Sequence, residues 1–241
     1  MEATLDACFE HIVVINLATR ADRRREMQAQ LQRIGLGLTA RGVQLFEAVK
    51  PAQAAGFDST GARGCFMSHL QVLRLARDSG WRSVLLLEDD LNFCADFAPR
   101  FAALAPDLGT GDWGMFYGSY STAQTLDTAP RLWVAADPTL ELSTTAFVAV
   151  QGRHIALLVQ YLEAMLARPP GDPLGGPMHI DGAYCWFRRS HPATATWLAN
   201  PPLGYQRASR TDIHPLRWFD RQPWSAALVA GLRRLRNRWQ G

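Results

Sequence analysis

The chain has 241 residues, of which 48% are hydrophobic and 20% are charged. This composition is ordinary for a folded domain and excludes a disordered, collagen-like or coiled-coil chain, while the length suits one α/β-sized unit. The formal net charge is +3, but the segment from Arg221 to Gly241 holds five arginines and no acid, so residues 1–220 carry 3 − 5 = −2. The basic excess is local, and we expect no nucleic-acid partner.

The first ten residues carry three acidic residues and no basic residue, which is the wrong charge for a secretory signal. The apolar runs are too short for a membrane-spanning helix. Four cysteines lie far apart and form no CxxC pair: Cys8, Cys65, Cys94 and Cys185. We therefore expect reduced thiols and a cytoplasmic protein.

The predicted elements alternate between strands and helices from the start of the chain. Residues 11–17 are a continuous β-branched run, typical of a strand buried on both faces. Thr19 and Asp22 resemble the start of a helix, which Met27 and Leu31 continue and Gly35 ends. A short strand is expected over 43–49, followed by a loop over 51–64 that is rich in alanine and glycine.

Helical spacing of apolar residues returns over 65–77 and again from 155 to 165. Further strands are expected over 83–87, 113–117 and 144–150, and residues 181–187 fit a helix turn or a strand. Residues 169–180 form a loop rich in proline and glycine, and regular periodicity is weak after Pro192. This alternation predicts an α/β fold with a mostly parallel central sheet flanked by helices.

An acidic run, Glu88-Asp89-Asp90, follows the strand at 83–87 directly. Ligands of open parallel sheets bind beyond the carboxyl ends of the strands. Three adjacent carboxylates repel one another unless a cation lies between them, and carboxylates together with diphosphate oxygens suit a divalent ion. A metal site and a solvated acidic turn are both compatible with this run.

Asn16, Arg20 and Arg23 lie near the carboxyl end of the first strand. Arginine and a helix N-terminus both suit a phosphate group. The alternative is that Arg20 and Arg23 belong to a solvated helix face, because Arg24 and Arg25 follow them.

Three further positions are compatible with chemistry or with a structural role. His69 is expected in the core, and its spacing from Cys65 gives half of a zinc site without a second pair. Asp181 is a candidate general base or a turn former. Asp212 and His214 are two residues apart and could complete a metal site that contains Asp90, or they could cap a helix.

Together these segments resemble glycosyltransferase family 25, the lipopolysaccharide and collagen galactosyltransferase-like family, from about Ile12 to Ile213. The resemblance rests on motifs that occur in the family's order: Val14-Ile15-Asn16-Leu17 with Arg20 and Asp22-Arg23-Arg24, Phe46-Glu47-Ala48-Val49, Gly64-Cys65-Phe66-Met67-Ser68-His69-Leu70, Leu86-Leu87-Glu88-Asp89-Asp90, Thr144-Thr145-Ala146-Phe147, Ile180-Asp181, and Gln206 with Thr211-Asp212-Ile213. Two positions depart from the pattern. Ala62-Arg63 stands where a glutamate is expected, and Thr211 replaces a serine.

The resemblance implies a GT-A-like domain over residues 1–221 and a metal-dependent, inverting transfer of a hexose. UDP-galactose is the expected donor, and a lipooligosaccharide or lipopolysaccharide glycan is the expected acceptor. Mn²⁺ or Mg²⁺ would bridge the diphosphate to the acidic run, with Asp90 as the main ligand and Asp212 and His214 as further ones. Asn16, Arg20, Arg23, Glu88 and Asp89 are assigned to the nucleotide, and Asp181 to the base that inversion requires.

Residues 222–241 predict a basic amphipathic helix, because the apolar residues Trp224, Leu228, Leu232, Leu235 and Trp239 recur at helical spacing. Such a helix could lie on the anionic surface of the inner membrane, near a lipid-linked acceptor, or it could pack on the domain. A transferase that acts on a protein or peptide, and an inactive nucleotide-sugar-binding module, are the alternative functions.

Overall fold

The computed structural model describes residues 4–126 and 131–207. A seven-stranded sheet forms the centre of the fold. Its strands are β1 (His11–Asn16), β2 (Val43–Glu47), β3 (Ser83–Glu88), β5 (Met115–Ser121), β6 (Trp133–Ala135), β7 (Ser143–Gln151) and β8 (Thr196–Ala199). The order across the sheet is β2-β1-β3-β7-β5-β8-β6. β1 and β3 are apolar along almost their whole length because both of their faces are covered.

Five strands run in one direction. β1 is parallel to β2 and β3, and β5 is parallel to β8, whereas β7 is antiparallel to β3 and β5, and β6 is antiparallel to β8. The mostly parallel sheet that we expected is confirmed. The reversed direction of β7 has a consequence for the site, because it brings the start of β7 beside the end of β3.

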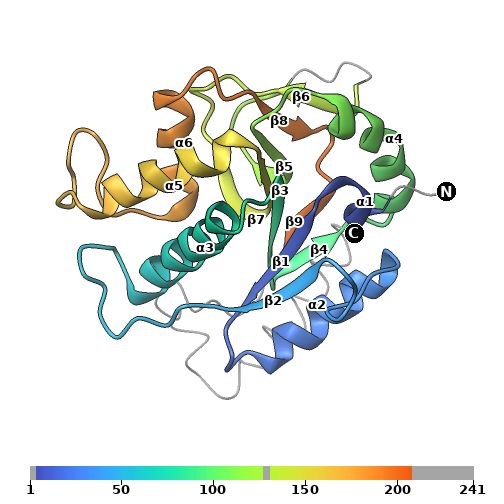
Figure 1. The fold of residues 1–241 in the computed structure, drawn as a ribbon, viewed down its shortest axis with the longest axis horizontal. Coiled ribbons are helices and arrows are strands. Elements are labelled where there is room, and N and C mark those ends of the chain that lie inside the picture. Colours follow the sequence, from blue (N-terminus) through green and yellow to red (C-terminus); the bar gives the residue numbers. More distant parts are fainter. Residues whose placement is uncertain (1–3, 127–130, 208–241) are drawn as a thin grey trace.

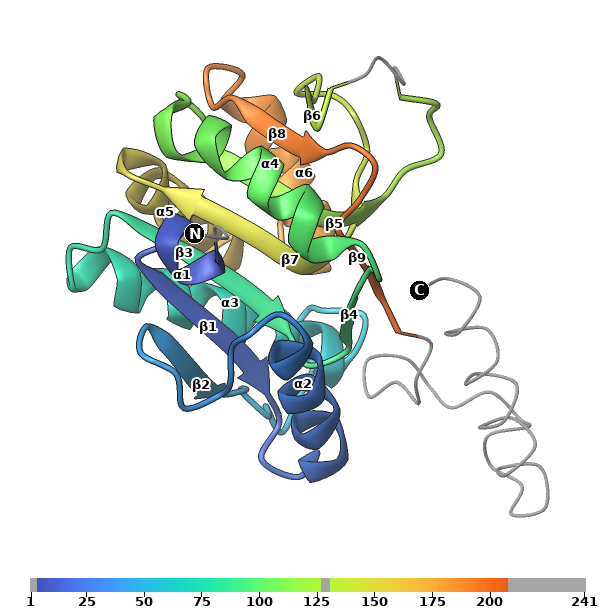
Figure 2. The same ribbon diagram turned by 90° about the vertical axis from the view of Figure 1, so that its right-hand side faces the viewer.

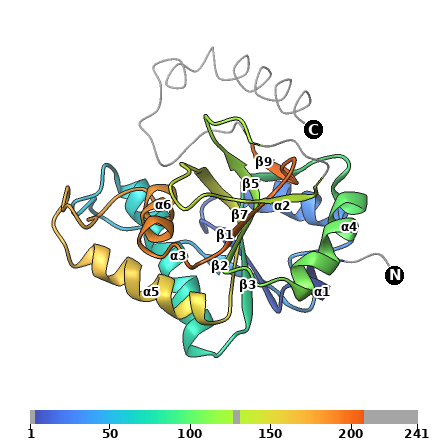
Figure 3. The same cartoon turned by 90° about the horizontal axis from the view of Figure 1, so that it is seen from above.

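Helices cover both faces of the sheet (Figures 1 and 3). One face packs against α3 (Thr60–Asp78), α5 (Arg153–Leu166) and α6 (Ile180–Ser190), and the other against α1 (Leu5–Cys8), α2 (Ala21–Arg33) and α4 (Phe97–Thr110). The sheet therefore separates two hydrophobic clusters. Phe66 and Leu158 belong to the first cluster, and Met27 and Phe101 to the second.

A second, two-stranded sheet pairs β4 (Leu91–Phe93) with β9 (Gly204–Gln206) in antiparallel register, with Leu91 opposite Gln206. β4 follows the acidic run after β3, so β9 brings a late segment of the chain to this run. Figure 2 shows β4 and β9 at the end of the sheet where β1 and β3 terminate.

Most of the expected elements are present, with shifted ends. α3 begins at Thr60, inside the segment predicted to be a loop, because the Ser59 side chain accepts a hydrogen bond from the Ala62 backbone amide and caps the helix. Residues 181–187 belong to α6. α1, α4, β4, β6, β8 and β9 are additional elements. None of the helices within the described residues is both long and apolar enough to span a membrane. The predicted helix at 222–241 and the boundary at 221 lie outside the described residues.

Candidate functional site

A cleft of about 230 Å³ opens where β1, β2 and β3 end, beside the first turns of α3. Parallel strands present their carboxyl ends at a common edge, and open α/β sheets bind ligands there. The lining residues come from these three strand ends, from α3 and from β9: Ile15, Leu17, Thr19, Arg23, Ala48, Val49, Lys50, Pro51, Thr60, Gly61, Gly64, Cys65, Ser68, His69, Glu88, Asp89, Asp90 and Gln206.

Asp89 and Asp90 are largely buried and are paired with basic and amide groups from the first βα unit. The Arg23 guanidinium lies 3.0 Å from Asp89 Oδ1 and 3.1 Å from Asp90 Oδ2. The Asn16 side-chain amide donates to Asp89 Oδ2 at 2.6 Å and to the Arg20 carbonyl at 3.2 Å. The structure therefore brings together four of the residues singled out from the sequence.

Glu88 contacts groups from two other elements, one of which is held by a third. Thr145, near the start of β7, donates its hydroxyl hydrogen to Glu88 Oε1 at 2.6 Å. His69 Nε2 lies 3.3 Å from the same oxygen, and His69 Nδ1 lies 3.0 Å from the hydroxyl of Tyr184 on α6. The antiparallel direction of β7 makes the contact with Thr145 possible.

Burial and mutual repulsion shift the pKa values of the three carboxylates in the acidic run by different amounts and in different directions. Burial and the adjacent Glu88 charge raise the pKa of Asp90 to about 7. Burial also raises the pKa of Asp89, although Arg23 opposes the change. Burial disfavours ionisation of Glu88 as well, but the His69 and Thr145 contacts outweigh it, and the pKa of Glu88 lies below its usual value. Negative charge on Asp90 is thus poorly compensated by the protein alone.

Gln206 and Arg207 approach the acidic run from the late segment. The Gln206 side-chain amide is 3.4 Å from both Asp90 carboxylate oxygens. The Arg207 backbone amide donates to the Asp90 carbonyl at 2.7 Å, and its guanidinium donates to the Asp89 carbonyl at 3.0 Å. The resemblance pointed to Gln206. Nothing local in the sequence indicated Arg207.

Other predicted residues occupy different positions. Arg20 pairs with Asp22 at 2.8 Å and is not among the residues that line the cleft. Asp181 lies in the first turn of α6, and its carboxylate accepts a hydrogen bond from the Gly182 amide at 2.8 Å. Burial and then the charges of Glu88, Asp90 and Asp181 raise the pKa of the Cys65 thiol, so Asp181 lies within electrostatic range of the cleft. Asp212 and His214 lie outside the described residues.

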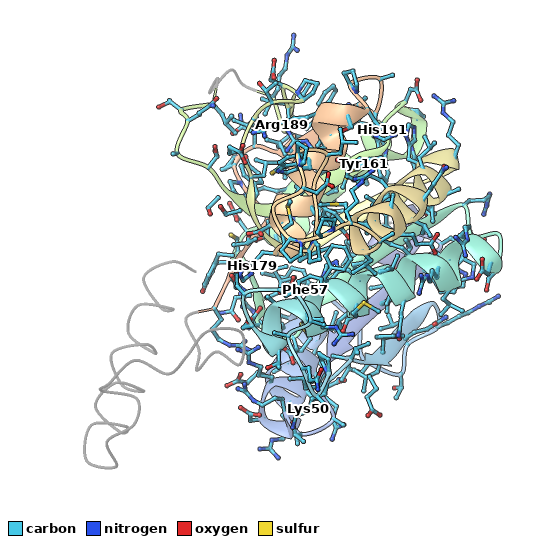
Figure 4. The ribbon with its side chains drawn as sticks, turned by 90° about the vertical axis from the view of Figure 1, so that its left-hand side faces the viewer. Lys50, Phe57, Tyr161, His179, Arg189 and His191 are labelled. Carbon is cyan, nitrogen blue, oxygen red and sulfur yellow. The ribbon has the colours of Figure 1, made fainter. Side chains whose placement is uncertain are left out.

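Several lining residues were not predicted as site residues. Lys50, the only lysine of the chain, is exposed at the mouth of the cleft just beyond β2. Figure 4 shows Lys50 at the same end of α3 as Phe57 and His179. Gly64 allows α3 to approach this strand end, since a Cβ there would lie 2.6 Å from the Val49 carbonyl oxygen. Ser68 ties the same two elements by accepting from the Val49 amide at 2.8 Å.

The fold and the acidic run define an α/β domain with a cleft at the carboxyl ends of its parallel strands. The glycosyltransferase involved in glycosylation of the PBCV-1 major capsid has a solved structure similar to this chain, with 9% identity, a TM-score of 0.46, and coverage of 83% of this chain and 93% of that one.

Residues 9–107 match the family model of glycosyltransferase family 25 (LPS biosynthesis protein). A glycosyltransferase 25 family member of Anopheles gambiae is 30% identical over 218 residues, which cover 81% of this chain and 36% of the relative. Procollagen galactosyltransferase 1 of Danio rerio is 29% identical, and the inactive glycosyltransferase 25 family member 3 of Homo sapiens is 27% identical, each over 127 residues that cover 45% of this chain and 21% of the relative. Residues 9–107 therefore match glycosyltransferase family 25, and the chain spans about a fifth to a third of the length of these curated relatives.

Proposed function

We propose that the chain is a glycosyltransferase that binds a nucleotide-sugar donor in the cleft at the ends of β1, β2 and β3. The observation that carries the proposal is the buried acidic run at the end of β3, which lines the cleft and lies against Arg23 and Asn16. Cationic and hydrogen-bonding groups beside carboxylates suit a diphosphate that is bound together with a divalent cation.

The residues fit Mn²⁺ or Mg²⁺. Carboxylate oxygens are the ligands that these cations prefer, and a bound cation would stabilise the charged form of Asp90, whose pKa burial and the Glu88 charge raise. We assign Asp90 as the main ligand, with Glu88 and Asp89 beside it, and keep Asp212 and His214 as candidates from outside the described residues. When bound, the cation would neutralise charge on the departing diphosphate.

The chain's own residues have separate roles in this proposal. The Asn16 side-chain amide holds Asp89 in position through its hydrogen bond, and Arg23 supplies a positive charge at the diphosphate. Arg20, which precedes the same helix and pairs with Asp22 outside the lining of the cleft, is kept as a candidate for the nucleotide side. Asp181 acts as the general base that removes the proton of the acceptor hydroxyl, so that the sugar is transferred with inversion and without a covalent intermediate.

The donor and acceptor follow from the family resemblance. We propose UDP-galactose as the donor and a lipid-linked lipooligosaccharide or lipopolysaccharide glycan as the acceptor. The segment 222–241 would place the enzyme on the cytoplasmic surface of the inner membrane, near that acceptor. Because procollagen galactosyltransferases are among the relatives, a peptide acceptor is the alternative to test.

Donor binding is tested by thermal unfolding with a panel of nucleotide sugars, with and without Mn²⁺, since a ligand that binds only the native state raises its apparent stability. UDP-galactose with Mn²⁺ should raise the melting temperature of the wild type and of Asp96→Asn, an exposed control, but not of Asp90→Asn. Equal stabilisation of Asp90→Asn would refute the metal assignment.

Transfer is then measured with lipid-linked glycans and with peptides as acceptors. Asp181→Asn should retain donor stabilisation and lose turnover. Normal turnover in this variant would assign the base to another group, and donor binding without transfer in the wild type would indicate a binding module.

A further inference from the structure

Three residues with metal-binding side chains converge on the inner wall of the cleft. Cys65 and His69 are one turn apart on α3, and Glu88 ends β3 opposite them. Their ligand atoms all lie within 4.8 Å of one another, and all three residues line the cleft. A thiol, an imidazole and a carboxylate differ from the oxygen-only set that Asp89 and Asp90 present.

His69 has one ring nitrogen held by a fixed partner and the other close to the Glu88 carboxylate. Its side chain is fully buried, and Nε2 has no hydrogen bond of good geometry although it lies 3.3 Å from Glu88 Oε1. Nδ1 is held by the Tyr184 hydroxyl at 3.0 Å, on the side of the ring away from the cluster. Metal-binding histidines usually have their second ring nitrogen fixed by such a partner.

We propose that Cys65, His69 and Glu88 form a binding site for Zn²⁺. Zinc takes thiolate, imidazole and carboxylate ligands in tetrahedral geometry, and sites with three protein ligands keep the fourth position open for water or another ligand. Metal–ligand distances of about 2.0–2.3 Å place tetrahedral ligand atoms about 3.5 Å apart, so the cluster needs to contract by about an ångström. The fourth position would face the cleft.

The ligand set selects for the softer cation. Mn²⁺ and Mg²⁺ prefer oxygen ligands, whereas a cysteine and a histidine together favour zinc. All three residues line the cleft proposed for the donor, and Glu88 also lies in the acidic run, but zinc binding needs no nucleotide sugar. The inference therefore stands or fails independently of the proposed transferase activity.

The first test measures zinc affinity by competition with a fluorescent chelator, using the full reduced chain without nucleotide. Cys65→Ser should bind zinc at least about 100-fold more weakly than the wild type, because it loses one of the three ligands. The matched control is Cys94→Ser, whose thiol is half-buried and contacts the Pro202 carbonyl away from the cluster. This control should keep wild-type affinity.

The second test replaces zinc with Co²⁺, which gives a thiolate-to-cobalt charge-transfer band when a cysteine is a ligand. The band should appear in the wild type and Cys94→Ser and be absent from Cys65→Ser. Tyr184→Phe keeps the aromatic ring and removes the hydroxyl that orients His69, and it should weaken zinc binding by roughly 10- to 100-fold. Folding of each variant is checked by its melting temperature.

Two results would overturn the inference. One is that Cys65→Ser, folded as judged by its melting temperature, binds zinc as tightly as the wild type, which would locate the metal at the acidic run. The other is that folded wild type gives no cobalt charge-transfer band.

Discussion

Arg23 contacts two carboxylates at once, Asp89 at 3.0 Å and Asp90 at 3.1 Å, and all three side chains are largely buried. Removing one partner of a buried ion pair leaves uncompensated charge, which costs far more than losing an exposed pair. We therefore expect Arg23→Gln to lower the free energy of unfolding of the metal-free protein by about 3 kcal/mol. Urea denaturation in the presence of a chelator measures this change.

Mn²⁺ should restore part of the stability of Arg23→Gln, because a cation at the acidic run would replace the missing guanidinium charge. Arg25→Gln, on the exposed side of the same helix, should change stability by less than about 0.5 kcal/mol. A loss of the same size in both variants would contradict the prediction.

His154 gives the protein a pH-dependent stability that is unrelated to the cleft. Burial, assisted by the charge of Arg153, lowers the pKa of His154, and its Nδ1 lies 3.1 Å from the Thr194 hydroxyl. The unfolded chain then takes up a proton at higher pH than the folded chain, so stability falls as the pH drops below about 6.5.

We expect the wild type to lose more stability than His154→Gln between pH of about 7.5 and 5.5, by up to about 1 kcal/mol. Urea denaturation at the two pH values measures both losses. All other groups are the same in the two proteins, so their contribution cancels in the comparison. Parallel losses would show that His154 titrates alike in the folded and unfolded states.

At the residue scale, the sequence was a better guide to which residues carry chemistry than to which residues contact one another. The charged residues after β1 and β3 could be predicted to meet, because both strands are parallel and end at one edge. The pairing of His69 with Glu88 could not, since it depends on the distance between α3 and β3. Lys50 was not predicted as a site residue either, because a single lysine in a loop belongs to no motif or periodic pattern.

Replacing a helical glycine with alanine should have opposite effects on stability at two positions of this protein. A Cβ on Gly64 of α3 would lie 2.6 Å from the Val49 carbonyl oxygen, whereas a Cβ on Gly109 of α4 would meet nothing within 4 Å. Gly64→Ala should destabilise the protein by about 1–3 kcal/mol, because it forces α3 away from the end of β2.

Gly109→Ala should instead stabilise the protein by about 0.5–1 kcal/mol through helix propensity. Thermal and urea unfolding of the two variants measure both signs. Because the same substitution is made twice, equal effects would show that the close approach of α3 to β2 does not constrain position 64.

Elements with strong local patterns were predictable, and those without were not. β1 and β3 are uninterrupted apolar runs, and α5 has apolar residues at regular helical spacing. α4 was not predicted because it contains Pro106 and has no side-chain cap. β8 and β9 were not predicted because they are only four and three residues long. The direction of β7 could not be predicted either, since an apolar run has the same pattern in both directions.

Across the whole molecule, protection from solvent should follow the order of the strands. β3 and β7 lie in the middle of the sheet with both faces covered, whereas β2 and β6 form its edges. We expect the backbone amides of β3 and β7 to exchange with deuterium most slowly, and those of β2 and β6 to exchange much faster.

Hydrogen exchange followed by mass spectrometry resolves these segments. Adding a nucleotide sugar with Mn²⁺ should slow exchange at the carboxyl ends of β1 and β3 and leave β6 unchanged. Protection that increases equally in all strands would instead indicate a global change in stability.

The pairing of β9 with β4 has a consequence for how the protein is made. Glu88, Asp89 and Asp90 emerge from the ribosome long before Gln206 and Arg207 have been translated. A nascent chain therefore carries the three carboxylates without these two neighbours until Gln206, 116 residues after Asp90, has been added. The cleft reaches its final form only after β9 has been made, when the chain has returned to the place where β3 ended.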